Sequence, residues 1–107
     1  FFEDISETPY RLDRLLTHLL NAGLLQQVAG VAVGSNQDCT DPNAAKAREY
    51  RQTAADVVKE RLLPLGVPVV TGLPFGHLPT NATIPIGVRA KLDANRGDLV
   101  IVEPPVC

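Results

Sequence analysis

The chain has 107 residues, a hydrophobic content of 45% and a formal net charge of −2 at pH 7. This length suits one domain with a real core but is short for a complete hydrolase. The ten basic residues are scattered and the few aromatic residues form no stacking platform, which argues against nucleic-acid binding. No apolar run approaches the roughly 20 residues that span a bilayer. We therefore expect one globular domain over residues 1–107 that binds neither nucleic acid nor membrane.

The first residues predict a strand that begins outside this sequence. Phe1 and Phe2 have the character of a strand end, and the residues around them lack the basic and apolar regions of a signal peptide. The sequence contains no methionine. We expect an excised piece of a longer chain.

The first predicted helix begins at Thr8 and Pro9, because threonine is a good helix cap and proline suits the first helical turn. It ends near Gly23, which is suited to a left-handed C-terminal cap. Its leucines recur at helical spacing and predict a single apolar face. These leucines are Leu12, Leu15, Leu16, Leu19 and Leu20.

The middle of the chain predicts a buried strand and a second helix. Val28–Val33 is a continuous apolar run, typical of a strand that is covered on both faces. A polar loop from Ser35 to Asn43 follows it. The second helix is then predicted from about Ala44 to Leu63, and Pro64 and Gly66 end it. Its inward positions should be Tyr50, Ala54, Val57, Val58 and Leu62.

The last third predicts three short strands. Val67–Thr71 is a second buried strand, while Ile84–Leu92 and Leu99–Val102 should form a hairpin turned at Asp93–Gly97. The order strand, helix, strand, helix, strand, hairpin predicts an α/β layered domain with a mixed sheet. The first half of that sheet should be parallel, through right-handed crossovers.

The two cysteines, Cys39 and Cys107, stand in a polar loop and at the last position. Without a framework of further cysteines, we expect two free thiols in a reducing compartment rather than a disulfide. Neither has a histidine beside it in the sequence, which argues against a nucleophilic thiol.

His77 is the first candidate for chemistry. It closes the run Leu73–His77 and is followed by Leu78 and Pro79. Two prolines and a glycine thus stiffen and turn the backbone around it, so the imidazole should sit in a shaped loop between strands. The alternative is a loop histidine that only bonds to the backbone. His18, beside the leucine face of the first helix, is expected to be solvated or half-buried and without a catalytic role.

Glu3 is the second candidate. Carboxylates are favoured just before a helix N-terminus, and that structural role suits Asp4 and Glu7. Glu3 instead follows two aromatic residues and should be partly enclosed, where a carboxylate needs a partner. An imidazole is a natural partner, and only tertiary folding can bring His77 to it. Together they would make two thirds of a nucleophilic triad.

Four segments of the chain, in this order, resemble the C-terminal domain of the LD-carboxypeptidases, which are muramoyltetrapeptide carboxypeptidases. The Gly-His pair with its Asn-x-Thr-x-Pro continuation is the specific part of the resemblance. Around Asn43 to Gln52 this sequence is several residues longer than the family pattern. The four segments, which cover essentially the whole chain, are Phe2–Leu16, Val28–Gly34, Gly66–His77 and Asn81–Gly87.

The resemblance implies a serine peptidase whose Ser-His-Glu triad is divided between two domains. Carried over onto this sequence, the catalytic residues are Glu3 and His77, and Glu7 stays an alternative for the acid. The serine would belong to an N-terminal domain. This agrees with the two serines present, Ser6 and Ser35, because neither lies in a Gly-x-Ser-x-Gly elbow.

The remaining polar residues of the motif are Asn81 and Thr83. They would either shape the loop that carries His77 or contact the substrate, and we favour the first role. No substrate-binding residue is assigned on this basis.

The implied reaction is hydrolysis of the amide between an L-centre and a terminal D-residue, the D-alanine of a murein tetrapeptide, in peptidoglycan recycling. It requires no metal or organic cofactor. The implied location is the cytoplasm, and the family commonly forms dimers. The partners would be the N-terminal domain and the substrate, so the isolated chain should be inactive. Two alternatives stay open: a non-catalytic interaction or structural domain, and a related self-immunity peptidase that cleaves a peptide–nucleotide antibiotic.

Overall fold

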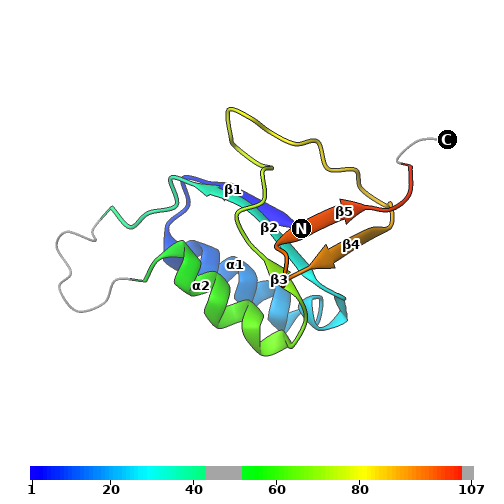
Figure 1. Ribbon diagram of the computed structural model, residues 1–107. Helices are drawn as coiled ribbons and strands as arrows, with labels where there is room; N and C mark the ends of the chain where they lie inside the picture. The colour runs from blue at the N-terminus through cyan, green and yellow to red at the C-terminus, as the bar shows by residue number, and fades with distance from the viewer. Residues whose placement is uncertain (43–51, 105–107) are drawn as a thin grey trace.

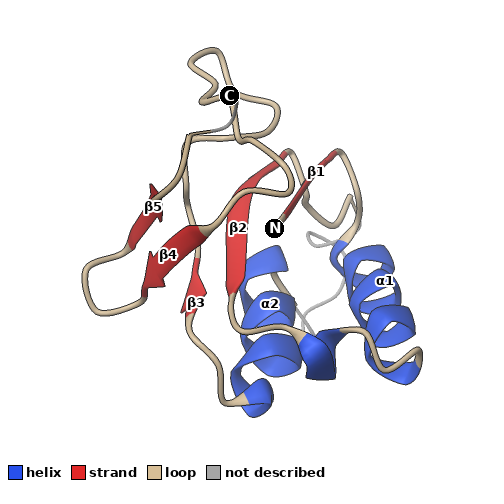
Figure 2. Cartoon of the chain, turned by 90° about the vertical axis from the view of Figure 1, so that its right-hand side faces the viewer, coloured by secondary structure: helices blue, strands red, loops and turns tan. Residues whose placement is uncertain are grey.

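The computed structural model describes residues 1–42 and 52–104. Two helices cover one side of a three-stranded parallel sheet, and an antiparallel hairpin lies on the other side (Figure 1). Figure 2 shows the same layers from the side, with β2 between the helices and the hairpin. The elements are β1 (Phe2–Ile5), α1 (Pro9–Asn21), β2 (Val31–Gln37), α2 (Ala54–Leu62), β3 (Val69–Val70), β4 (Ala90–Asp93) and β5 (Asp98–Ile101), with short 3₁₀ turns at Leu25–Gln27 and Leu63–Leu65.

Helix α1 begins and ends where the sequence predicts. Thr8 is the N-cap residue with an extended backbone and Pro9 opens the helix, although the Thr8 side chain makes no capping bond. Gly23, just beyond the last turn, has a φ of 72°, the left-handed conformation that glycine adopts without strain.

The leucines of α1 do not form one buried face. Leu12 and Leu16, one turn apart, are each 2% exposed and pack into the core. Leu15 and Leu19 were expected on the same face but are 46% and 39% exposed. The correction follows from helix geometry, because a small domain covers one narrow stripe of a helix and these two leucines lie on the neighbouring stripe.

Helix α2 begins at Ala54. The sequence predicts a helix from about residue 44, and this is wrong at Gln52 and Thr53, which precede the helix. A capping box fixes this start: the Asp56 N–H donates to Thr53 Oγ1 (3.1 Å), and the Thr53 N–H donates to Asp56 Oδ2 (2.9 Å). Residues 43–51, which include Tyr50 and most of the longer segment, lie outside the described residues. The inward positions at the other end, Val57, Val58 and Leu62, are buried as predicted.

Strand β2 is covered on both faces, as its apolar run predicts. Val31 and Val33 pack into the core beneath α1 and α2, whereas Ala32 packs with Val70, Leu73 and Phe75 on the opposite face. Alternate side chains of a strand point to opposite faces, which explains this division.

The bounds of β2 differ from the prediction. The strand starts at Val31 rather than Val28 and extends to Gln37, into the expected polar loop. The cause is parallel pairing with β1, which reaches Ile5 opposite Gln37 and gives the backbone of these polar residues hydrogen-bond partners.

The fold class is α/β as predicted, with parallel pairing in the first half and a C-terminal hairpin. The hairpin forms a sheet of its own rather than the end of one mixed sheet. Strands β3 and β4 are shorter than predicted, whereas β5 has the predicted length of four residues and begins one residue earlier. Residues 84–89 are not in a strand, in keeping with Pro85, which has no N–H for a ladder. No helix within residues 1–42 and 52–104 is long and apolar enough to cross a membrane.

An ion pair joins the two helices. The Arg61 guanidinium on α2 donates two hydrogen bonds to the Asp13 carboxylate on α1, one from Nε and one from Nη2, the latter at 3.1 Å. The Arg61 hydrogen bond is the main reason that the pKa of Asp13 is lowered, while partial burial of the carboxyl opposes the shift.

This ion pair predicts a stability that falls in acid. Because the folded pKa of Asp13 lies below its unfolded value of about 3.9, the pair stabilises the fold above that pH and loses its effect as the pH falls through the folded pKa. We expect Asp13→Asn to lower the free energy of unfolding by about 0.5–1 kcal/mol at pH 7 and by less at pH 2. Urea unfolding followed by circular dichroism measures both values.

The control for this prediction is Asp98→Asn in the hairpin. Asp98 pairs with Arg96 at 2.9 Å, but the two side chains are 43% and 75% exposed, so we expect a much smaller effect. An Asp13→Asn effect of equal size at both pH values would contradict the ion-pair explanation.

Candidate active site

A bulge in the parallel sheet presents Glu3. Phe2 lies opposite Val33 and Asp4 opposite Asn36, so Glu3 on β1 faces two residues of β2, Gly34 and Ser35. A β-bulge of this kind bends a strand locally and changes the direction of the side chains around it. The Glu3 side chain is 28% exposed, which confirms that it is partly enclosed.

After β3 the chain continues along the edge of β2 that is opposite β1, and it brings His77 close to Glu3. The Leu73 N–H donates to the Val33 carbonyl (3.2 Å), and the Ser35 N–H donates to the Phe75 carbonyl (2.9 Å). Phe75 is 4% exposed and anchors the segment in the core, so the following residues have a fixed starting point. This segment, drawn in yellow-green in Figure 1, leaves β3 and runs beside β2.

Glu3 and His77 meet as the sequence predicts. His77 Nδ1 lies 2.7 Å from Glu3 Oε2. An ionised carboxylate only accepts hydrogen bonds, so this contact places a proton on Nδ1 and leaves Nε2 as the ring nitrogen that can take one up. The His77 side chain is 51% exposed, which keeps the imidazole accessible to another group.

Asn81 shapes the loop around His77, the role favoured from the sequence. The Gly76 N–H donates to Asn81 Oδ1 (3.0 Å), and the Ala82 N–H donates to the Pro74 carbonyl (2.7 Å). These two bonds close the loop on both sides of His77. Asn81 therefore fixes the backbone that aims the imidazole.

Two glycines make the site geometrically feasible. Gly76 has a φ of +108°, and a Cβ there would fall 2.7 Å from Glu3 Oε2 and 2.8 Å from Ser35 Oγ. A Cβ at Gly34 would collide with the carbonyl and the ring of Phe75. Gly76 was expected from the sequence to turn the backbone before His77, whereas Gly34 was assigned no role in the site. The position of Gly34 at the end of the buried run was the available signal.

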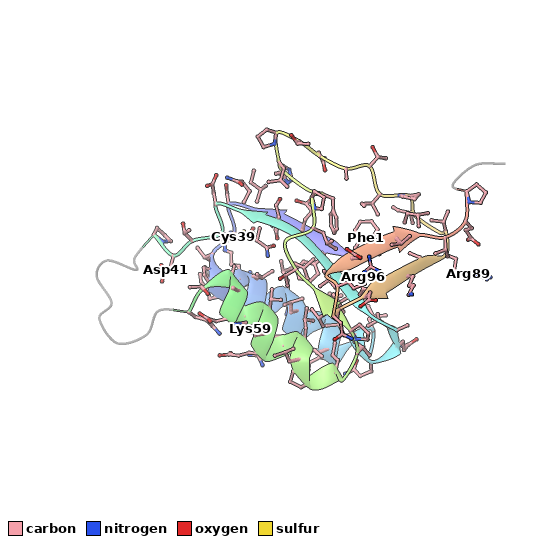
Figure 3. The ribbon with its side chains drawn as sticks, viewed as in Figure 1. Phe1, Cys39, Asp41, Lys59, Arg89 and Arg96 are labelled. Atoms are coloured by element: carbon pink, nitrogen blue, oxygen red, sulfur yellow. The ribbon has the colours of Figure 1, made fainter. Side chains whose placement is uncertain are left out.

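The site opens into a shallow depression of about 560 Å³. Phe1 and Phe75 meet edge to face at its wall, with ring centroids 5.5 Å apart. Figure 3 labels Phe1, which also borders a second, apolar hollow of about 380 Å³ between the sheet and the hairpin. The depression is lined by Phe1, Glu3, Phe75, Gly76, His77, Asn81, Ala82, Thr83, Ile84 and Ile86.

The other residues considered for a catalytic role have different surroundings from Glu3 and His77. Glu7, the alternative acid, lies 3.6 Å from Arg11 Nη1 and is not in the lining of the depression. His18 is exposed on α1, as expected. Within the described residues, no group of three or more His, Cys, Asp or Glu side chains could hold a metal ion.

Cys39 is a free thiol but is not exposed in a polar loop. It is 6% exposed, at the end of β2 away from the hairpin (Figure 3). Burial raises the pKa of the thiol, which makes the thiolate less available as a nucleophile. Cys107 lies outside the described residues.

The chain matches known peptidases along most of its length. The sequence model of the family described as LD-carboxypeptidase C-terminal domain matches residues 1–92. A putative carboxypeptidase of Synechocystis sp. is 43% identical over 97 residues, which are 91% of this chain and 31% of that protein. A putative carboxypeptidase of Streptomyces coelicolor is 41% identical over 105 residues, or 98% of this chain and 31% of that protein.

A third relative carries a more specific name. The murein tetrapeptide carboxypeptidase of Pseudomonas aeruginosa is 33% identical over 94 residues, which are 88% of this chain and 29% of that protein. The chain thus spans about a third of the length of these curated relatives. The match confirms the resemblance found in the sequence: the chain belongs to the LD-carboxypeptidase family and corresponds to its C-terminal domain.

Proposed function

We propose that this domain supplies the acid and the base of a Ser-His-Glu triad in a serine LD-carboxypeptidase. The substrate would be a murein tetrapeptide, from which the enzyme releases the terminal D-alanine during peptidoglycan recycling in the cytoplasm. The observation that carries the proposal is the 2.7 Å contact between Glu3 and His77 in a domain of this family. The name of the Pseudomonas relative supports the choice of substrate.

In this mechanism His77 moves the proton. Nε2 accepts the proton of a serine hydroxyl as the serine oxygen attacks the carbonyl carbon of the scissile amide, and it then gives that proton to the departing amine as the C–N bond breaks. Water repeats the sequence on the acyl-enzyme and regenerates the serine. Backbone amides near the serine would stabilise the oxyanion.

Glu3 has a different task, because it never touches the substrate in this scheme. Its carboxylate holds the Nδ1–H of His77, which fixes the tautomer and the ring orientation, and it stabilises the imidazolium that forms when Nε2 is protonated. Loss of the charge alone, with the shape preserved, should therefore impair catalysis.

The serine is proposed to come from an N-terminal domain that covers the depression. Around His77, Ile86 is 85% exposed and Phe1 60% exposed, an apolar rim that suits contact with another domain. Such a cover would exclude water and lower the local dielectric constant. The attraction between Glu3 and the imidazolium would then be stronger than at an open surface.

The first test removes the base. In the full-length enzyme we expect His77→Ala to lower kcat/KM for D-alanine release from murein tetrapeptide by about a thousandfold or more, because no group then accepts the serine proton. His18→Ala is the matched control, since His18 is exposed on α1, and it should retain nearly full activity. Release of D-alanine that survives His77→Ala would remove His77 from the mechanism.

The second test distinguishes the two carboxylates. Glu3→Gln keeps the shape of the side chain but removes its charge, and we expect kcat to fall by about a thousandfold to ten-thousandfold. Glu7→Gln makes the same change at a residue that pairs with Arg11, and its kcat should stay close to that of the wild type. The reverse result would assign the acid role to Glu7.

The third test concerns the division of the site. Residues 1–107 alone should release no D-alanine, because neither serine of this chain lies in a nucleophile elbow, whereas the full-length protein should be active. A coupled D-amino-acid oxidase assay at equal protein concentrations measures both. Robust turnover by the isolated domain would contradict the two-domain arrangement, and an inactive full-length protein would favour a non-catalytic domain.

A further inference from the structure

Ser35 places a buried hydroxyl beside the proposed acid. Its Oγ has essentially no accessible surface and no hydrogen-bond partner among the described residues. A hydroxyl removed from water without a partner costs free energy, so such groups are rare and call for an explanation. The mechanism above gives this side chain no task.

The position of the Ser35 hydroxyl suggests a role for it. A Cβ built on Gly76 would come 2.8 Å from Ser35 Oγ and 2.7 Å from Glu3 Oε2, so both oxygens border the same position beside Gly76. The bulge in the sheet also places Ser35 in the pair of β2 residues that faces Glu3. Sheet register and side-chain position thus both place the hydroxyl near the carboxylate.

The backbone around Ser35 is held in place. Its N–H donates to the Phe75 carbonyl (2.9 Å), and Phe75 precedes Gly76 in the buried segment. The hydroxyl is free to rotate and is a single donor, while a carboxylate offers about four acceptor positions. His77 uses one of those positions, which leaves room for a second donor on Glu3.

We propose that Ser35 is a positioning residue, whose hydroxyl donates a hydrogen bond to the Glu3 carboxylate and holds it in line with Nδ1 of His77. The inference rests on the proposed triad and extends it by one residue. The structure does not show this bond, which requires a rotation of the Ser35 or the Glu3 side chain. Without it, water competes with His77 for the 28% exposed carboxylate.

The experiment is a double-mutant cycle in the full-length enzyme with murein tetrapeptide as substrate. We expect Ser35→Ala to lower kcat about tenfold to a hundredfold, the effect of one hydrogen bond to a charged group, with KM unchanged because Ser35 does not contact substrate. In a Glu3→Ala background the same substitution should have no further effect, because the group that it positions is gone.

Ser6→Ala is the matched control, since Ser6 is the other serine of the chain and is exposed beyond the end of β1. It should leave kcat unchanged. Thermal unfolding separates positioning from folding: Ser35→Ala removes at most one side-chain hydrogen bond and no packing, so the Tm should change little.

The outcomes are distinct. Wild-type kcat in Ser35→Ala, or a loss that persists undiminished in the Glu3→Ala background, would overturn the role of Ser35. A kcat loss accompanied by a fall in Tm of several degrees would also overturn it, in favour of a structural role. Full activity of Glu3→Ala by itself would instead refute the proposed triad, on which this inference depends.

Discussion

The site depends on backbone pairing between β2 and the segment that follows β3. The bonds from Leu73 to Val33 and from Ser35 to Phe75 fix this segment along the strand. Gly34 allows the close approach, because any side chain there would collide with Phe75. The fixed segment ends immediately before the loop of His77, and so the imidazole reaches β1 although the two elements are far apart in the sequence.

The resulting pair combines a rigid support with an accessible imidazole. Phe75 is buried and Asn81 closes the loop, while the ring of His77 remains about half exposed. A carboxylate and an imidazole at a surface interact weakly, because water screens both. In the same geometry, the carboxylate and the imidazole interact much more strongly once a neighbouring surface excludes that water. A divided active site is therefore physically reasonable for this domain.

Much of the fold could be predicted, and the errors have identifiable causes. The capping residues correctly predicted the position of α1. The apolar runs correctly predicted the core of β2 and the buried positions of α2. The end of β2 was missed because the polar residues up to Gln37 owe their strand conformation to pairing with β1. The start of α2 was predicted wrongly because the Thr53–Asp56 capping box lies within a segment whose whole sequence pattern predicts a helix.

The α/β class, the family and the identity of the two residues proposed for chemistry could be recognised from the amino-acid sequence, because they follow from local patterns and from a specific Gly-His motif. The remaining features of the site depend on how the chain folds. The bulge opposite Glu3, the glycine contacts and the buried hydroxyl of Ser35 arise only when β1, β2 and the His77 segment lie side by side. No local pattern encodes such a meeting, since register and close approach depend on how distant segments pack together.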